Sequence, residues 1–231
     1  MTKIIVEIVC GNIESVVAAQ QGGADRIELC DNLHEGGTTP DYLRIEAAKK
    51  IVSAPIHVMI RPRGGNFLYS DVEFEIMKQD MKVCRQLNVE GVVTGILNMD
   101  GSVDKNRTKE LVALAGPMPV TFHRAFDITD DPFRAMEDII DCGCRRILTS
   151  GQQPTAIEGA EMISELNTLS KGRIIILPGG GIRPENVALL IEKTKPTEIH
   201  SSAKEKTGEI TDAAMVKSLK QIVSSFVHSK F

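Results

Sequence analysis

Short runs of β-branched and other apolar residues alternate along the chain with longer segments that carry apolar residues at helical spacing. A short apolar run between turn residues is typical of a buried strand, and an apolar residue every three or four positions is typical of an amphipathic helix. The eight predicted strands are Ile4–Cys10, Arg26–Cys30, Ile56–Arg61, Gly91–Gly95, Pro119–His123, Arg146–Ser150, Arg173–Pro178 and Glu198–Ser201. The clearest predicted helices are Tyr42–Val52, Asp71–Leu87, Asp104–Ala115, Pro132–Cys142, Ala156–Leu169, Pro184–Lys193 and Asp212–Val227.

This alternation predicts an α/β fold with a parallel sheet built from repeated strand–helix units. Eight units in 231 residues give about 29 residues for each unit, which fits a closed TIM (β/α)8 barrel. An open doubly wound sheet is the alternative. No G-x-G-x-x-G phosphate loop follows the first predicted strand, so we favour the barrel and expect no nucleotide cofactor. No Pro- or Ser-rich linker divides the chain, and we expect residues 1–231 to form a single domain.

The composition excludes several kinds of partner. The chain has 42% hydrophobic and 25% charged residues, as ordinary globular domains do. A net charge of -4 and the lack of a long basic run argue against nucleic acid. No apolar stretch approaches the length of about 18 residues that a transmembrane helix needs, so we expect no membrane partner. Five cysteines do not suggest a disulfide framework and suit a reducing compartment, and we therefore expect a cytoplasmic protein.

Ionisable residues recur near the ends of the predicted strands. In a barrel, alternate strand residues point into the interior, and reactive groups gather where the strands meet the loops that follow them. This alternation places six residues at comparable late positions, namely Glu7, Glu28, Arg61, Thr94, His123 and His200. Five of the six are ionisable, and an unpaired charge in an apolar interior is costly. We therefore expect these side chains to pair with one another, to bind a ligand or to meet water in a pocket.

Two interpretations of this cluster stay open. In the first, Glu7, Glu28 and Arg61 form a structural ion-pair network, and the two histidines are hydrogen-bonded core residues. In the second, the cluster is an active site in which Arg61, with Arg63 from the next loop, holds an anionic substrate bidentately. Glu7 or Glu28 then transfers a proton, and His123 is its acid/base partner or an electrophile. Two glutamates and two histidines are also a reasonable set of ligands for a divalent metal.

Loops on the same rim have the composition of anion receptors. The residues concerned are Gly179, Gly180 and Gly181 after the seventh predicted strand, and His200, Ser201 and Ser202 at the end of the eighth. Barrels commonly hold a phosphate at these two places, on glycine amides and serine hydroxyls. Thr149 and Ser150, at the end of the sixth strand, add hydroxyls to the rim. We expect an anion site here, with a tight turn that needs glycine as the alternative.

Cys10 and Cys30 end the first and second predicted strands, which are neighbours in a barrel. Two thiolates at one rim suit Cu(I), which is a soft ion. Alternation argues partly against such a pair, because Cys30 shares a face with Glu28 whereas Cys10, three residues from Glu7, should face the opposite way. The alternative is that both cysteines are small buried apolar residues.

Seven distinctive motifs extend from the second predicted strand to the eighth. They are GGADRIELC (22–30), EGGTTP (35–40), IRPRGGNFLYSD (60–71), PVTFHRAFD (119–127), ILTSG (147–151), PGGGI (178–182) and HSSA (200–203). Together they closely resemble the copper-homeostasis protein CutC family. This resemblance implies a TIM barrel, a cytoplasmic location and self-association, which we expect to give a dimer. It also implies copper handling, with Cu(I) bound by the cysteines that match Cys10 and Cys30.

Two functions therefore stay open. The resemblance favours a copper-homeostasis protein that binds Cu(I) through Cys10 and Cys30. The residues themselves favour an enzyme that acts on a small anionic or phosphorylated metabolite, and the side chains concerned are Glu7, Glu28, Arg61 and His123. Two sulfur atoms suffice to hold a copper ion, but they do not explain an arginine, three glycines and two serines on the same rim.

Overall fold

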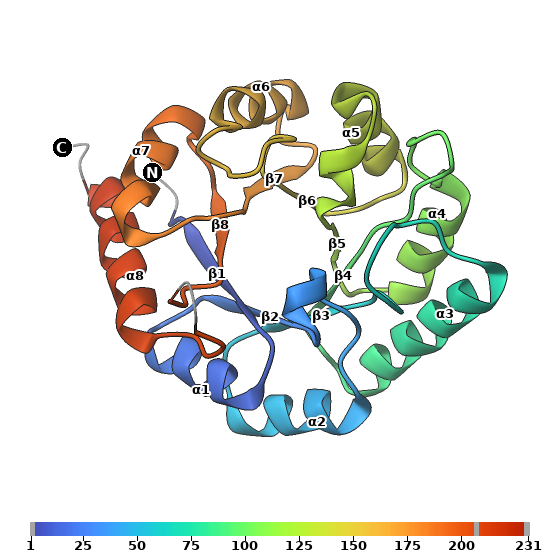
Figure 1. Cartoon of the computed structure of the whole chain (residues 1–231), viewed down its shortest axis with the longest axis horizontal. Helices are drawn as coiled ribbons and strands as arrows, with labels where there is room; N and C mark the ends of the chain where they lie inside the picture. The colour runs from blue at the N-terminus through green and yellow to red at the C-terminus, as the bar shows by residue number, and fades with distance from the viewer. Residues whose placement is uncertain (1–2, 206–207, 229–231) are drawn as a thin grey trace.

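Eight parallel strands form the centre of the molecule, which is described for residues 3–205 and 208–228 of a computed structural model (Figure 1). The strands are β1 (Ile5–Cys10), β2 (Arg26–Leu29), β3 (Ile56–Met59), β4 (Gly91–Thr94), β5 (Val120–Phe122), β6 (Arg146–Thr149), β7 (Ile175–Pro178) and β8 (Glu198–Ser201). Their order is β7-β6-β5-β4-β3-β2-β1-β8, and a parallel bridge between Gly179 and His200 joins the two ends. The sheet is therefore closed, and the predicted TIM barrel is confirmed.

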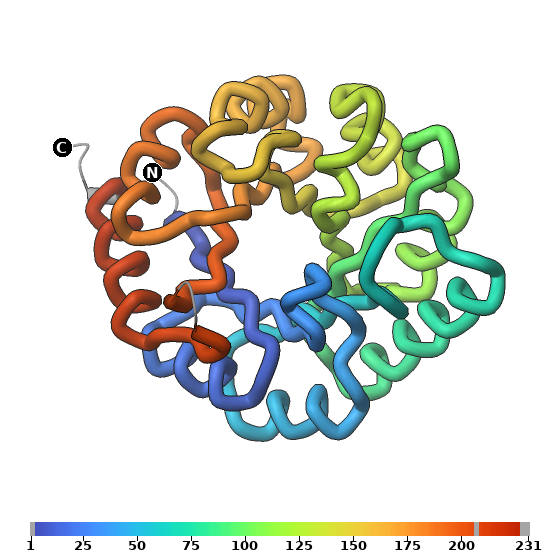
Figure 2. The backbone as a smooth tube through the Cα atoms, viewed as in Figure 1, coloured from blue at the N-terminus to red at the C-terminus, as the bar shows by residue number. Residues whose placement is uncertain are grey.

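The helices form a ring around the outside of the barrel (Figure 2). They are α1 (Ile13–Gln21), α2 (Tyr42–Ile51), α3 (Asp71–Gln86), α4 (Lys105–Ala115), α5 (Pro132–Asp141), α6 (Ala160–Ser170), α7 (Pro184–Thr194) and α8 (Ala213–His228). Two short 3-10 helices, η1 (Leu33–Glu35) and η2 (Arg124–Ile128), lie in the loops after β2 and β5. Hydrophobic periodicity does not predict them because they are too short to show a period. None of the helices in the described ranges combines the length and the hydropathy needed to cross a bilayer.

Most predicted boundaries differ from the observed ones by one or two residues, but α6 begins four residues later than expected. The side chains of Thr155 and Glu158 bond to each other and to each other's backbone N–H groups, which closes a turn ahead of the helix. The backbone N–H of Ala156 donates to the carbonyl of Gly180, 2.9 Å away in the loop after β7. The segment before α6 is thus tied to the neighbouring loop instead of continuing the helix.

Apolar side chains pack in two separate places. The main core lies between the sheet and the helices and includes Ile8, Leu29 and Phe122, whereas a small inner cluster of Val9, Cys30, Met59 and Val93 lies inside the barrel. Strand alternation produces this division, since neighbouring residues face opposite sides.

Thr94 follows Val93 of the inner cluster and therefore faces outward, where its hydroxyl donates to the carbonyl of Ile60 at 3.0 Å. The prediction that Thr94 points into the barrel is wrong. The strand β4 is apolar on both faces, so its sequence did not indicate which residues belong to the interior.

Candidate functional site

Charged side chains fill the part of the barrel interior that lies toward the amino ends of the strands. We call Glu7, Arg26, Arg146 and Glu198 the floor layer. Arg26 donates from Nε to Glu7 and from Nη2 to Glu198, and Arg146 donates from Nε to Glu198 at 2.8 Å. Each of the four side chains is at most 11% exposed. Two carboxylates therefore balance two guanidinium groups out of contact with solvent, which a buried ion-pair network requires.

Three floor residues, with His57 beside them, were not among the predicted interior groups. Arg26 lies two positions before Glu28, and Glu198 lies two positions before His200, so the same alternation extended toward the strand starts would have found them. His57 lies against Gly91, where a Cβ atom would be 2.4 Å from its Nε2. Burial, with the charges of Arg26 and Arg146, lowers the pKa of His57 to about 3, and its ring is neutral.

Glu7 connects the floor layer to His200. Its Oε1 accepts a hydrogen bond from His200 Nδ1 at 2.7 Å, while its Oε2 accepts from Arg26. Burial alone would raise the pKa of Glu7, but the charge of Arg26 and the hydrogen bond from His200 bring it well below its usual range. Both oxygens are occupied and the carboxylate stays ionised, so Glu7 orients His200 and is not free to transfer a proton.

A cavity of about 410 Å³ opens where the strands run into the loops that follow them. We call it the mouth cavity. It is lined by Val9, Glu28, Leu33, Glu35, Gly36, Met59, Arg61, Gly65, Phe67, His123, Arg124, Leu148 and His200. Its volume lies within the range of about 300–1,000 Å³ that is usual for small-molecule sites. The structure thus brings Glu28, Arg61, His123 and His200 to one opening, whereas Glu7 lies beneath it.

Three buried polar atoms of residues that line the mouth cavity have no hydrogen-bond partner among the described residues. They are Glu28 Oε2, Arg61 Nε and His123 Nε2. The three residues are at most 3% exposed. Buried polar atoms are normally paired, and each one left without a partner costs about 1–3 kcal/mol. Their convergence on one cavity indicates a place where a ligand supplies the missing partners.

Glu28 has the environment of a residue that exchanges protons near neutral pH. Burial raises the pKa of Glu28 to about 7, with the charge of Glu7 adding to the effect and those of His200 and Arg26 opposing it. The pKa of His200 is also raised, because the negative charges of Glu28 and Glu7 outweigh the effect of burial. The carboxyl of Glu28 therefore has a comparable chance of being protonated or ionised at physiological pH.

His123 is a neutral hydrogen-bond donor. Its Nδ1 accepts the backbone N–H of Ala125 at 3.2 Å, which places the ring proton on Nε2. Burial and the charge of Arg61 lower the pKa of His123 to about 3. The ring lies against Gly95, where a Cβ atom would be 2.5 Å from Nδ1, so the absence of a side chain at this position makes room for the imidazole.

Arg61 is a buried cation without a counter-ion among the described residues. Its Nη1 donates to the carbonyls of Glu35 and Gly37, and its Nη2 donates to the carbonyl of Gly65. These bonds join the loop after β2 to the loop after β3. They use both protons of Nη1 and one of the two on Nη2, so Arg61 can offer a ligand its Nε–H, the second N–H of Nη2 and its charge.

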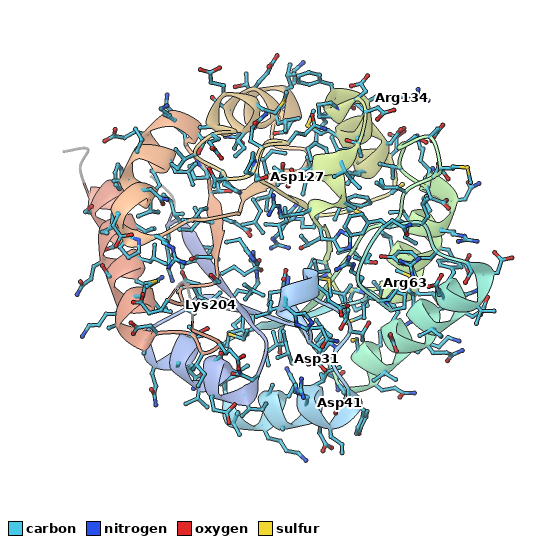
Figure 3. The ribbon with its side chains drawn as sticks, viewed as in Figure 1. Asp31, Asp41, Arg63, Asp127, Arg134 and Lys204 are labelled. Atoms are coloured by element: carbon cyan, nitrogen blue, oxygen red, sulfur yellow. The ribbon has the colours of Figure 1, made fainter. Side chains whose placement is uncertain are left out.

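Arg63 does not line the mouth cavity. Its Nε donates to Glu73 at 2.6 Å, and its two Nη atoms donate to Asn66 and to the carbonyl of Leu68. Figure 3 shows it beside the loop after β3, away from the barrel axis. Its contacts hold this loop to the start of α3.

The predicted anion loops have defined structures. The carbonyl of Gly180 accepts from Ala156, and the carbonyl of Gly181 accepts from Asn186 Nδ2. Gly179 donates to the carbonyl of Thr149 within the barrel wall.

The serines of these loops differ in their partners. The hydroxyl of Ser201 donates to the carbonyl of Ile182 at 2.7 Å, which ties the loop after β8 to the loop after β7. Ser202 is partly exposed, and its hydroxyl forms no hydrogen bond with the described residues. Ser150 Oγ bonds to Asp127 and to Arg124. Of the three, Ser202 has the least occupied side chain.

Arg124 lines the mouth cavity and was not predicted. Its Nε donates to Asp127 and its Nη2 donates to Ser150 Oγ, each at 2.6 Å. Asp127 lies at the rim (Figure 3) and also accepts from Thr149, the backbone N–H of Ser150 and the backbone N–H of Gln152. Arg124 follows His123 in η2, so its position depends on loop geometry that strand alternation does not describe.

Cys10 and Cys30 lie on opposite faces of the sheet. Cys10 packs in the main core and Cys30 in the inner cluster, which is the orientation that alternation favours. Burial raises the pKa of the Cys10 thiol to about 12 and that of Cys30 well above its usual value. All five cysteines are unpaired and buried. In this state Cys10 and Cys30 are thiols, whereas Cu(I) binds thiolates.

Glu7, Glu28 and His200 carry potential metal-ligand atoms within 4.8 Å of one another. The oxygens of Glu7 already bond to His200 and Arg26, and the Nδ1 of His200 is used in the same contact. Glu28 and the Nε2 of His200 alone remain available, which is fewer than the three protein ligands of a usual catalytic zinc site. As arranged, Glu28 and His200 suit proton transfer better than metal binding.

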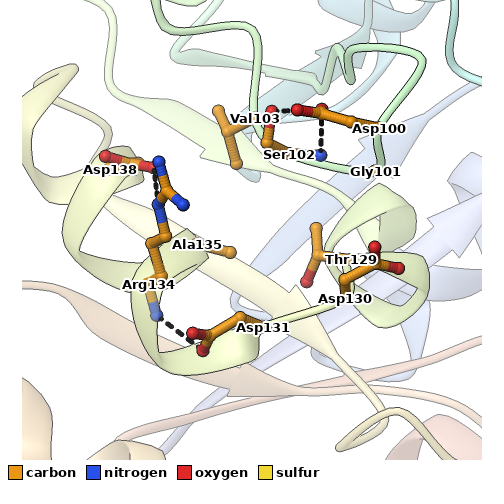
Figure 4. Close-up of a pocket in the computed structure, with 10 residues that line it drawn as sticks. All are labelled: Asp100, Gly101, Ser102, Val103, Thr129, Asp130, Asp131, Arg134, Ala135 and Asp138. Carbon is orange, nitrogen blue, oxygen red and sulfur yellow. Dashed lines mark hydrogen bonds and ion pairs between the residues drawn. The ribbon is translucent and has the colours of Figure 1, made fainter.

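A second pocket of about 150 Å³ lies between the loop after β4 and the start of α5 (Figure 4). Its acidic side chains have local partners: Asp131 caps α5 by accepting from Phe133 and Arg134, and Asp100 accepts from Ser102. Asp138 bonds to Lys105 at 2.5 Å. None of the unpartnered buried atoms of the described residues belongs to this pocket, and we do not consider it a candidate site.

The closed barrel and its mouth define a TIM-barrel protein with a polar opening at the carboxyl ends of the strands. The chain belongs to the CutC family, whose model matches residues 4–205. A family protein CutC from Chromobacterium violaceum is 50% identical over 213 residues, which cover 92% of this chain and 85% of that protein. The copper homeostasis protein cutC homolog of Homo sapiens is 46% identical over 200 residues, covering 87% of this chain and 73% of that protein.

Solved structures agree with this assignment. The crystal structure of a CutC protein from Streptococcus agalactiae has a TM-score of 0.82 and 32% identity, and the match covers 86% of this chain and 98% of that one. Thiamine phosphate pyrophosphorylase from Pyrococcus furiosus has a TM-score of 0.65 at 17% identity, with 97% of each chain covered. The second likeness concerns the fold alone.

Proposed function

We propose that the mouth cavity is the active site of an enzyme that acts on a small anionic metabolite. The observation that carries this proposal is Arg61, a guanidinium group 3% exposed beside a cavity, with an unpartnered Nε and no counter-ion among the described residues. An unpaired buried charge costs several times the thermal energy, and a bound anion removes that cost. The floor layer differs from Arg61 in this respect, because each of its guanidinium groups has a carboxylate partner.

The neighbouring side chains have the properties needed for proton transfer. Glu28 takes up or releases a proton, since its pKa of about 7 is near the working pH of a general acid or base. His123 presents a neutral Nε2–H that stabilises negative charge developing on a substrate oxygen. A carboxylate base beside a neutral imidazole donor suits proton abstraction next to a carbonyl group, and this is the reaction class that we propose.

The proposal is tested by exposing the protein to a mixture of small phosphorylated and carboxylated metabolites, with native mass spectrometry and thermal shift as the measurements. We expect a ligand on the unaltered chain that is lost in Arg61→Gln and weakened in His123→Phe. Arg63→Gln removes an equal charge from the same loop outside the cavity and should retain the ligand. Absence of any ligand, or equal loss in Arg61→Gln and Arg63→Gln, would contradict the proposal.

A second candidate function is copper homeostasis through direct Cu(I) binding, which we propose because relatives at 46–50% identity include one named for that role. Cys10 and Cys30 are the candidate ligands. Because their side chains face opposite sides of β1 and β2, binding by both requires one side chain to turn or the strand end to shift. Cu(I) titration under reducing conditions should show a stoichiometric site that disappears in the Cys10→Ser, Cys30→Ser double variant. Unchanged stoichiometry would exclude this pair.

We also propose a cytoplasmic location and a homodimer. Five unpaired thiols support a reducing compartment. Light scattering on the purified chain measures the mass of the particle, and a value near twice 25.2 kDa is the expected result. A monomeric mass across the concentration range would contradict the dimer.

A further inference from the structure

We infer that the rim of the mouth cavity carries a phosphate subsite, formed by Nη1 of Arg124 and the backbone N–H groups of Gly181 and Ile182. The metabolite is accordingly a phosphate monoester. This inference rests on the proposed function and names its class of substrate. It concerns a part of the rim that is separate from Glu28, Arg61 and His123, so the two can be tested independently.

Arg124 is held in place with one of its donor atoms free. Nε and Nη2 bond to Asp127 and Ser150, and Asp127 is fixed in turn by the N–H groups of Ser150 and Gln152 and by the hydroxyl of Thr149. Nη1 has no hydrogen-bond partner among the described residues. A guanidinium fixed in this way loses little side-chain entropy on binding an anion. The charge of Asp127 is spread over several donors, which leaves Arg124 able to attract a second anion.

The loop after β7 approaches this free donor. A Cβ atom on Gly180 would lie 3.5 Å from Nη1 of Arg124 and 3.2 Å from Cβ of Ser150. Gly180 and Gly181 have φ angles of +111° and +70°, which strain any other L-residue. Glycine is therefore favoured here by the backbone conformation and, at position 180, by the short distance to Ser150.

The carbonyl bonds of the same loop determine where its N–H groups point. The carbonyl of Gly180 points to Ala156, and that of Gly181 points to Asn186 on α7. In a trans peptide the N–H points opposite to the carbonyl, so the N–H groups of Gly181 and Ile182 are directed away from these partners. Neither N–H has an acceptor among the described residues, whereas the N–H of Gly180 lies on the β8 side, where the bridge between Gly179 and His200 forms. Successive free N–H groups of this kind form an anion-binding concavity.

Arg124 connects the subsite to the proposed chemistry. Arg124 lines the mouth cavity together with Glu28, Arg61 and His123. A phosphate dianion takes several charge-assisted hydrogen bonds, some of which the Nη1 of Arg124 and the two backbone N–H groups can supply. A phosphate at the rim leaves the rest of a small molecule to extend toward Arg61 and His123, where the unpartnered atoms lie.

The test is an NMR titration of the full-length, ¹⁵N-labelled chain with inorganic phosphate, with chloride at equal ionic strength as the reference. We expect the amide signals of Gly181 and Ile182 to move with phosphate and not with chloride. Arg124→Gln should weaken phosphate binding about tenfold or more, because it removes a charge-assisted contact. Arg134→Gln is the control, since it removes an equal charge from an exposed side chain on α5.

Glycerol 3-phosphate is the second probe and shows whether the site prefers a phosphate monoester to free phosphate. It should bind at least about tenfold more tightly than inorganic phosphate, because it adds contacts inside the cavity. Arg61→Gln should weaken glycerol 3-phosphate and leave inorganic phosphate unchanged. If the probe binds no more tightly than inorganic phosphate, the assignment of a phosphate monoester is wrong.

Unmoved loop amides, or equal losses in Arg124→Gln and Arg134→Gln, would overturn the subsite itself. Failure of the proposed function has a different signature. In that case phosphate still binds at the loop after β7, while Arg61→Gln and His123→Phe have no effect on any metabolite.

Discussion

The floor layer and the mouth cavity are both built from buried charged residues on the inner face of one barrel, yet they differ in how the charges are paired. In the floor layer, Arg26 and Arg146 each contact a carboxylate. At the mouth, Arg61 bonds to backbone carbonyls and lies over the Phe67 ring with no carboxylate partner, and Glu28 Oε2 has no partner among the described residues. Interior charge by itself therefore does not distinguish a site from a structural network. The lack of a counter-charge beside a cavity is the more informative observation.

The two interpretations of the charged cluster, a structural network and an active site, apply to different residues. Glu7 belongs with the structural network, because both its oxygens are occupied. Glu28, Arg61 and His123 belong with the proposed site, because each lines the mouth cavity and has a polar atom without a partner among the described residues. Substitutions in the floor layer should accordingly lower stability, and substitutions at the mouth should lower ligand binding with little loss of stability.

The largest effect should come from Glu198→Gln, which removes the carboxylate shared by Arg26 and Arg146. Breaking a buried pair leaves an uncompensated charge, and we expect the free energy of unfolding to fall by about 3–5 kcal/mol. Denaturant unfolding measures it. Glu137→Gln breaks an exposed pair with Arg173 and should cost less than about 1 kcal/mol. Similar losses in the two variants would show that the floor pairs contribute no more than surface pairs.

Glu28→Gln should raise the free energy of unfolding at high pH, which is the opposite of the effect expected for Glu198→Gln. The pKa of Glu28 rises from 4.5 to about 7 on folding, so between these values the native state binds more protons than the unfolded state, and stability falls as pH rises. Glutamine does not ionise and avoids this loss. The variant should be more stable than the unaltered chain by up to about 3 kcal/mol at pH 8, with the difference vanishing below about pH 4.5.

Denaturant unfolding at several pH values measures the effect of Glu28→Gln. Glu161→Gln makes the same chemical change on the exposed face of α6 and should leave the pH dependence unaltered. A Glu28→Gln variant that is less stable than the unaltered chain at pH 8 would place Glu28 in the structural network.

Gly91 in β4 and Gly95 just after it allow a matched test of the floor layer and the mouth cavity. A Cβ atom at position 91 would lie 2.4 Å from His57 Nε2, and one at position 95 would lie 2.5 Å from His123 Nδ1. Gly91→Ala and Gly95→Ala should each cost about 1–3 kcal/mol by overpacking. Only Gly95→Ala should also displace His123 and weaken ligand binding. Histidine NMR signals identify the ring that moves, and displacement of the same ring in both variants would contradict this account.

The smallest effect concerns the thiols. With a pKa of about 12, Cys10 is a thiolate in about one molecule in ten thousand at pH 8, and burial further limits access. A chromogenic thiol reagent should therefore react with the native chain far more slowly than with the chain in denaturant, where all five cysteines are available. Rapid native reaction of Cys10 or Cys30, identified by peptide mapping, would show that this thiol is accessible and readily ionised.

The barrel and part of the site could be predicted because both depend on simple periodicities. Strand–helix alternation indicates the eight repeats, and strand alternation places Glu28, Arg61 and His123 in the interior. The prediction fails for Thr94 because β4 is apolar on both faces. The prediction misses Arg26 and Glu198 because it considered only the late positions of each strand, and these two residues lie at strand starts.

Residues in loops were harder to predict than residues on strands. Arg124 and Arg63 both follow a strand by a few positions, yet one lines the mouth cavity and the other holds the loop after β3. Which of the two faces the opening depends on the backbone path of each loop. That path depends on contacts such as those of Asp127 with Ser150 and Gln152, which no sequence period reveals.

The contacts between β1, β2 and β8 bear on how the chain is made. His200 and Glu7 are 193 residues apart in sequence, and Glu198 and Arg26 are 172 apart. While the chain is being synthesised, the amino-terminal half lacks Glu198, the second carboxylate that pairs with Arg26, and His200, which bonds to Glu7. Ribosome-bound fragments that end before residue 198 thus carry Arg26 and Arg146 without the carboxylate that they share, and the last strand to emerge completes both the ring of strands and its electrostatic balance.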